Sequence, residues 1–132
     1  MKSIQQRVLI ADDNIDGAMS LEVLLLHSGY DVRVAHDGLG ALELAQSFSP
    51  RAAILDIGMP GLTGYEVAEY IRAAPWGRRM VLIALTGWGQ AADKRRAFVA
   101  GFDHHLTKPI EPDHLETLLR TVLSAERATG SS

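Results

Sequence analysis

Short apolar runs recur along the chain at nearly even spacing, and segments with helical periodicity lie between them. Three of the runs are apolar at consecutive positions, at 8–11, 52–55 and 80–85. Such runs are typical of strands that are buried on both faces, as in the centre of a parallel sheet. Two weaker runs, at 32–35 and 104–106, complete a set of five predicted strands.

Each predicted strand is followed by a segment in which apolar residues recur every three or four positions. The predicted helices span 14–28, 38–47, 64–74, 89–100 and 112–126. Asn14 can cap the first helix, because its side-chain oxygen can accept a free backbone N–H group. Gly29 and Gly101 can end helices in the left-handed conformation. The alternation predicts an α/β fold in which helices cover both faces of a parallel sheet.

Length and composition narrow the class of protein. The 132 residues predict one domain over 1–126 and a short polar tail over 127–132. The chain contains no cysteine, which excludes a disulfide scaffold, an iron–sulfur cluster and a cysteine nucleophile. The net charge of −3 disfavours direct binding of nucleic acid. No apolar run is long enough for a membrane span and no signal-peptide core is present, so we expect a cytoplasmic protein without membrane insertion.

Residues that could form a binding or catalytic site follow four of the five predicted strands. In chain order they are Asp12, Asp13, Asp56, Thr86, Gly87, Lys108 and Pro109. The carboxyl ends of parallel strands share one edge of the sheet, and this is where open α/β sheets bind their ligands. We therefore expect three acids, one hydroxyl group and one ammonium group to meet in one shallow crevice.

The predicted crevice has the chemistry of a metal and phosphate site. Three neighbouring carboxylates repel one another, and a divalent cation relieves that repulsion. Oxygen ligands without His or Cys favour a hard ion, with Mg²⁺ first and Mn²⁺ as an alternative. Lys108 offers a positive charge to an anion such as phosphate. Asp56 is the candidate nucleophile for an aspartyl-phosphate, because its strand is central and the other two acids are sequence neighbours.

These motifs, together with Met59-Pro60 behind Asp56, resemble in their order the receiver domain of two-component response regulators. The resemblance extends from about Arg7 to Glu126. It implies a doubly wound (βα)5 flavodoxin-like three-layer sandwich with the parallel strand order 2-1-3-4-5. It also implies that Asp56 accepts a phosphoryl group from a histidine kinase or a histidine phosphotransfer domain, in a Mg²⁺-dependent reaction.

The resemblance implies roles for the other matched residues. The metal site would comprise Asp12 through water, Asp13, Asp56 and the backbone carbonyl of Gly58. The phosphoryl group would be bound by Thr86, Gly87 and Lys108. Thr86 and His105 would act as switch residues, and the bond before Pro109 would be cis. The resemblance therefore implies a signalling switch whose surface around residues 86–110 changes on phosphorylation. It does not imply an enzyme that turns over an outside substrate.

Four positions depart from the usual receiver pattern or vary within it. Receivers usually carry Tyr or Phe where this chain has His105, so we hypothesise that activation depends on pH through this imidazole. His104 stands where many receivers place an acid for dimerisation, so we expect a monomer or a weak dimer. Gly58 and Trp88 flank the predicted site. Trp88 either restricts access of water and partners or is an exposed loop aromatic.

Two other classes of protein share part of the pattern. An aspartyl-phosphate phosphohydrolase uses a similar set of Asp, Thr, Lys and Mg²⁺, but its nucleophile usually follows the first strand. A flavin- or nucleotide-binding module would use residues 87–92, which match a glycine-rich fingerprint. A free-standing regulator and the receiver of a hybrid histidine kinase are both compatible with the sequence, and the effector and the cognate kinase are left open.

Overall fold

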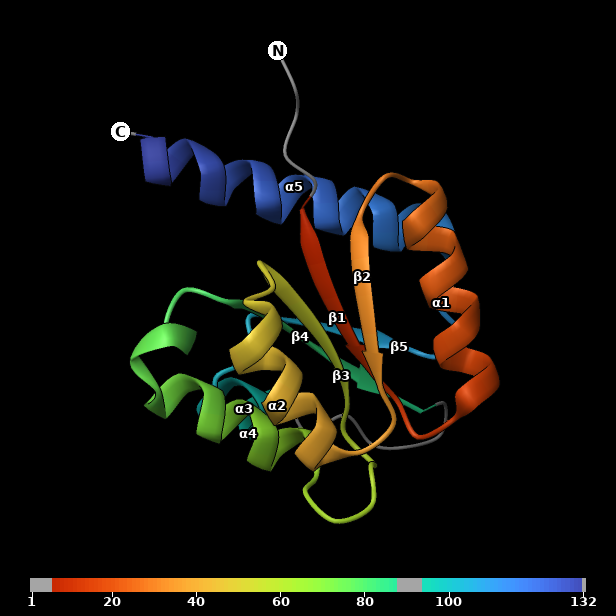
Figure 1. The fold of residues 1–132 in the computed structure, drawn as a ribbon, viewed down its shortest axis with the longest axis vertical. Coiled ribbons are helices and arrows are strands. Elements are labelled where there is room, and N and C mark those ends of the chain that lie inside the picture. The colour runs from red at the N-terminus through yellow and green to blue at the C-terminus, as the bar shows by residue number, and fades with distance from the viewer. Residues whose placement is uncertain (1–5, 88–93, 132) are drawn as a thin grey trace.

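The computed structural model describes residues 6–87 and 94–131, and within them the chain forms a five-stranded parallel sheet in the order β2-β1-β3-β4-β5 (Figure 1). The strands are β1 (Arg7–Ala11), β2 (Asp31–Ala35), β3 (Ala52–Asp56), β4 (Val81–Thr86) and β5 (His104–Thr107). The helices are α1 (Ile15–His27), α2 (Gly38–Phe48), α3 (Gly64–Ala73), α4 (Lys94–Ala100) and α5 (Pro112–Ser131), with a 3-10 turn η1 (Pro75–Gly77). The predicted fold class and strand order are confirmed.

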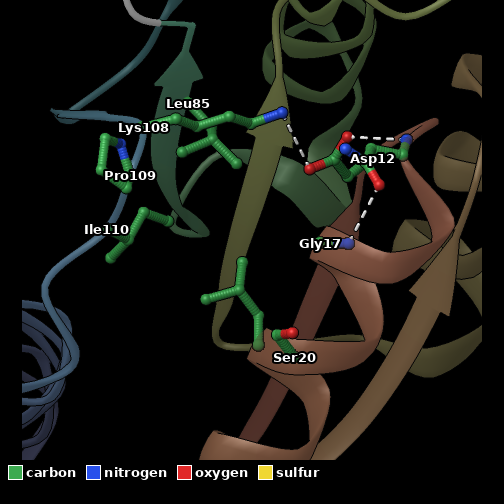
Figure 2. Close-up of a pocket in the computed structure, with 9 residues that line it drawn as sticks. Asp12, Gly17, Ser20, Leu85, Lys108, Pro109 and Ile110 are labelled. Carbon is green, nitrogen blue, oxygen red and sulfur yellow. Dashed lines mark hydrogen bonds and ion pairs between the residues drawn. The ribbon is translucent and has the colours of Figure 1, made fainter.

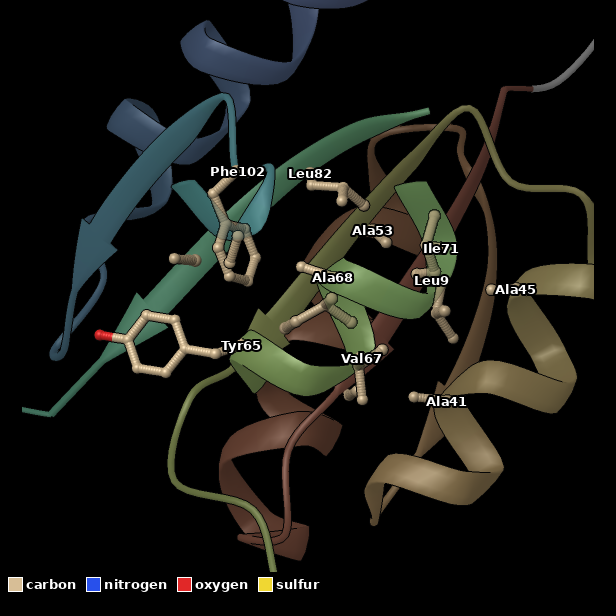
Figure 3. Packing of buried hydrophobic residues seen from close by; sticks show 14 of the residues in the cluster. Leu9, Ala41, Ala45, Ala53, Tyr65, Val67, Ala68, Ile71, Leu82 and Phe102 are labelled. Carbon is tan, nitrogen blue, oxygen red and sulfur yellow. The ribbon is translucent and has the colours of Figure 1, made fainter. Parts of the chain in front are cut away.

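Two hydrophobic cores lie on opposite faces of the sheet. Leu9 and Ala53 pack with α2, α3 and α4 on one face (Figure 3), whereas their neighbours Ile10 and Ile54 pack with α1 and α5 on the other. All four side chains are fully buried. The central strands read as continuous apolar runs because helices cover both faces.

The predicted helix cap and the two predicted glycine stops are present, but the last helix is longer than predicted. The side-chain oxygen of Asn14 accepts a hydrogen bond from the N–H of Gly17 at 3.0 Å, as its predicted capping role requires. Gly29 and Gly101 have φ of 98° and 115°, in the left-handed region. The helix predicted to end at residue 126 continues to Ser131. Arg127 and Ala128 are strong helix formers, so the polar tail does not end the helix at its first residue.

The helix predicted over 89–100 is described from Lys94 onward, and its first part, with Trp88 before it, lies outside the described residues. Among the helices that the structure describes, none combines the length and the apolar character needed to cross a membrane.

Candidate functional site

Three acidic residues meet at the carboxyl edge of the sheet. Asp12 directly follows β1 and is 1% exposed, and Asp56 is the last residue of β3 and is 6% exposed. Asp13 is exposed beside them. One carboxylate oxygen from each residue lies within 4.8 Å of the others. The convergence predicted from the strand ends is therefore present, and the donor set fits a hard divalent cation.

Lys108 brings a positive charge to this group. Its Nζ lies 3.1 Å from Oδ2 of Asp12 (Figure 2) and 3.5 Å from Oδ2 of Asp56. The backbone N–H of Lys108 donates to the carbonyl of Thr86 at 2.8 Å, which ties the segment after β5 to the end of β4. The peptide bond between Lys108 and Pro109 is cis, as predicted.

The pKa values of Asp56 and Lys108 both differ from their usual values. Burial is the main cause that raises the pKa of Asp56 from 3.8 to about 6. The N–H of Gly58, which donates to Oδ1 at 3.0 Å, and the charge of Lys108 oppose this rise, whereas Asp12 adds to it. Burial disfavours the ammonium group of Lys108, but Asp12 and Asp56 outweigh that effect and raise its pKa. The site thus holds excess negative charge that a cation would stabilise.

The loop after β3 holds Asp56 close to the start of α3. The N–H of Ile57 donates to the carbonyl of Leu85 at 3.1 Å, and the N–H of Gly64 donates to the carbonyl of Ile57 at 3.0 Å. A Cβ atom on Gly64 would lie 2.6 Å from the backbone oxygen of Asp56, so only glycine permits this approach. Gly58 contributes its N–H here, and a role for its carbonyl stays a prediction.

Thr86 and His105 are also brought together. Thr86 is 4% exposed, and its Oγ1 lies 3.1 Å from Nε2 of His105. The hydroxyl group also lies 3.4 Å from the carbonyl of Leu106. The register pairs His105 with Ala84, so the imidazole and Thr86 share one face of the sheet. The two predicted switch residues are thus in direct contact.

Sequence reasoning missed His36. Its Nδ1 lies 3.0 Å from the backbone carbonyl of Asp12. The signal was available, because His36 directly follows β2 just as Asp12 follows β1. The same rule of strand ends, applied to the weakly apolar second strand, would have placed this imidazole at the edge of the site.

A cavity of about 220 Å³ opens beside Asp12 and Lys108. Gly17 and Ser20 of α1 line one side, and Pro109 and Ile110 line the other (Figure 2). The cavity exists because Gly17 and Ser20 are small, and apolar residues such as Ile110 form part of its lining.

Comparison with known proteins decides the family. The model of the response regulator receiver domain matches residues 8–120. The chain belongs to this family. Receiver domains are signalling switches of two-component systems, and the family implies a histidine kinase as partner. The phosphohydrolase reading is not supported, and most of the glycine-rich fingerprint at 87–92 lies outside the described residues.

Among curated proteins, the chain is 37% identical over 117 residues to the transcriptional regulatory protein TctD of Salmonella typhimurium, covering 89% of this chain and 51% of that protein. The chain thus spans about half the length of that relative.

Solved receiver structures share the fold. A putative response regulator from Chloroflexus aurantiacus has a TM-score of 0.86 at 33% identity, covering 92% of this chain and 99% of the other. The receiver domain of the sensor histidine kinase PA1611 from Pseudomonas aeruginosa has a TM-score of 0.82 at 31% identity, covering 89% and 97%. That structure holds a magnesium ion in its active-site cleft.

Proposed function

We propose that this receiver domain is a phosphoacceptor in which Asp56 takes a phosphoryl group from a histidine kinase or a histidine phosphotransfer domain. The observation that carries the proposal is the meeting of Asp12, Asp13 and Asp56 with Lys108 at one edge of the sheet. We take residues 1–126 as the extent of this domain.

The acidic group suits Mg²⁺, with Mn²⁺ as an alternative. Asp13 and Asp56 would bind the ion, together with the carbonyl of Gly58, and Asp12 would act through water. When bound, Mg²⁺ offsets the repulsion among the carboxylates and supplies positive charge to phosphoryl oxygens. The magnesium ion in the PA1611 receiver domain supports this assignment.

The chain's own groups then account for the transfer. A carboxylate oxygen of Asp56 attacks phosphorus as the bond from phosphorus to the donor's imidazole nitrogen breaks, and the released imidazole takes a proton from water. Lys108 moves from the carboxylates to a phosphoryl oxygen. Thr86 exchanges its contact with His105 for a hydrogen bond to another phosphoryl oxygen, and Gly87 leaves room beside it.

The movement of Thr86 would convert phosphorylation into a change of surface. Its contact with His105 is made in the present structure. Loss of that contact would free the imidazole, so the surface around residues 86–110 would shift toward a second state. Turnover of an outside substrate is not part of this function.

An apolar stripe on α1 supports a protein as the phosphoryl donor. Ile15, Met19 and Val23 recur at a spacing of four residues and are 58%, 54% and 61% exposed. The stripe begins three residues after Asp12, so a helix of the donor that covers it also reaches the site.

The proposal is tested by incubating the protein with Mg²⁺ and acetyl phosphate and measuring its intact mass. One added phosphoryl group is expected for the wild type and none for Asp56→Asn. Asp37→Asn is a matched control, because Asp37 is an exposed acid that caps α2 at the same edge of the sheet. No adduct, or an undiminished adduct in Asp56→Asn, would refute the proposal.

A further inference from the structure

Five arginines gather at the amino edge of the sheet, opposite the acidic site. They are Arg7, Arg33, Arg51, Arg78 and Arg79, here called the amino-edge arginines. The backbone sets them in a row. The N–H of Arg51 donates to the carbonyl of Arg7 at 2.8 Å, and the N–H of Val81 donates to the carbonyl of Arg51 at 2.9 Å. Positive charge therefore extends across β2, β1, β3 and the turn before β4, a width of about 15 Å for three strand spacings.

One aromatic ring holds two of these guanidinium groups together. The Cζ atoms of Arg33 and Arg7 lie 4.8 Å and 5.5 Å from the ring centroid of Phe48. Arg7 also donates to the carbonyl of Phe48 at 2.9 Å, and Arg33 pairs with Asp31 at 3.2 Å. Cation–π contacts thus fix two like charges side by side, and several of their N–H groups are left for an external anion.

The turn before β4 adds two exposed positive charges. Arg78 and Arg79 are exposed, and within the described residues their side chains form no hydrogen bond or ion pair. Arg72 differs, because its guanidinium binds backbone carbonyls of this region and pairs with Asp103 at 2.7 Å. Trp76 lies in η1 just before the two arginines and is 41% exposed.

We propose that the amino-edge arginines and Trp76 form a peripheral docking surface for an anionic phospholipid membrane. The charges lie along an edge of the sheet, and the cavity beside Tyr30 at the start of β2 is lined by Glu116 and Arg120 and by none of the amino-edge arginines. Four of the five arginines are exposed and Arg51 is half-buried. Such a row of cations suits the plane of lipid headgroups, and tryptophan favours the boundary between headgroups and acyl chains. The carboxyl edge with Asp56 would face away from the lipid.

The test measures binding of the full chain to phosphatidylcholine vesicles with and without phosphatidylglycerol. Binding is expected only to the anionic vesicles and is expected to weaken with salt. The double variant Arg78→Gln/Arg79→Gln should lower the partition coefficient roughly 30-fold, since two basic residues each contribute about fivefold near an anionic surface. Both residues are exposed, so the variant should keep its fold, which circular dichroism checks.

The matched control is Lys94→Gln/Arg95→Gln, which removes the same charge from two exposed residues of α4. It should bind nearly as well as the wild type. In a Trp88→Phe background, Trp76 is the only tryptophan left, and its emission should shift to the blue on anionic vesicles. No vesicle binding, or equal losses in both double variants, would overturn the proposal. Binding of a single-stranded oligonucleotide through Arg78 and Arg79, without vesicle binding, would also overturn it.

Discussion

The hydroxyl oxygen of Thr86 lies 3.1 Å from Nε2 of His105, across the pairing of β4 with β5. Thr86 is buried, and its hydroxyl group also donates to the carbonyl of Leu106 at 3.4 Å, so it has two contacts within the protein. Any phosphoryl group on Asp56 would compete with them.

A double-mutant cycle of Thr86→Ala and His105→Phe measures this contact. We expect a coupling of about 1 kcal/mol in the free energy of unfolding of the unphosphorylated protein, the usual contribution of one hydrogen bond. Chemical denaturation of the four proteins gives the value. With Mg²⁺ and beryllofluoride, a mimic of a phosphoryl group, the coupling should disappear. Additive effects in the free protein would show that the contact contributes nothing.

The hypothesis of a pH-dependent switch rests on the imidazole of His105. The initial rate of phosphorylation by acetyl phosphate should follow a different pH profile in His105→Phe than in the wild type, because the variant replaces an ionisable imidazole with a ring that carries no charge. His104→Phe is the matched control, since its imidazole is not in contact with Thr86 in the described structure. Identical profiles for wild type and His105→Phe would end the hypothesis.

The raised pKa of Asp56 predicts how the stability of the metal-free protein depends on pH. The folded protein holds the proton up to about pH 6 and the unfolded chain releases it near 3.8, so stability falls as pH rises between these values. Asp56→Asn removes this loss, and it should be more stable than the wild type at pH 7 by at most about 3 kcal/mol. The difference should vanish below the lower pKa. Thermal unfolding of both proteins at pH 7 and at a pH below 3.8 checks this. Mg²⁺ should stabilise the wild type more than the variant.

Lys108 is the cation that balances Asp12. Lys108→Gln should destabilise the metal-free protein by about 1–3 kcal/mol, because the buried carboxylate of Asp12 loses its charged partner. The variant should also accept a phosphoryl group more slowly from acetyl phosphate. Lys94→Gln is the control, since Lys94 is exposed at the start of α4. Equal stability and equal rates in the two variants would contradict the role of Lys108.

Two glycines near the site should respond in opposite directions to alanine. In Gly64→Ala, the new Cβ would lie 2.6 Å from the carbonyl oxygen of Asp56, so the variant should be destabilised and Asp56 displaced. In Gly17→Ala, the nearest atom would be 3.5 Å away, so the higher helix propensity should stabilise α1 by up to about 1 kcal/mol. Denaturation curves of both variants decide this, and a stable Gly64→Ala would show that the close approach is not needed.

The placement of the acids was predictable because it follows from local rules. A strand buried on both faces is a continuous apolar run, and the residue after it reaches one common edge, which located Asp12 and Asp56. The strand order came from the family resemblance, since burial on both faces does not tell one central strand from another. The contact between Thr86 and His105 depends on side-chain rotamers, and no periodicity encodes these. His36 was missed because its strand is only half buried, which made the apolar signal weak.

The central claim is that Asp56 itself carries the phosphoryl group. Treating the phosphorylated protein with borohydride reduces an aspartyl-phosphate to homoserine, and peptide mass spectrometry then locates the converted residue. The account predicts conversion at position 56 alone, dependent on Mg²⁺ during phosphorylation. Conversion at Asp12 or Asp13, or a phosphoryl group that resists borohydride, would contradict it.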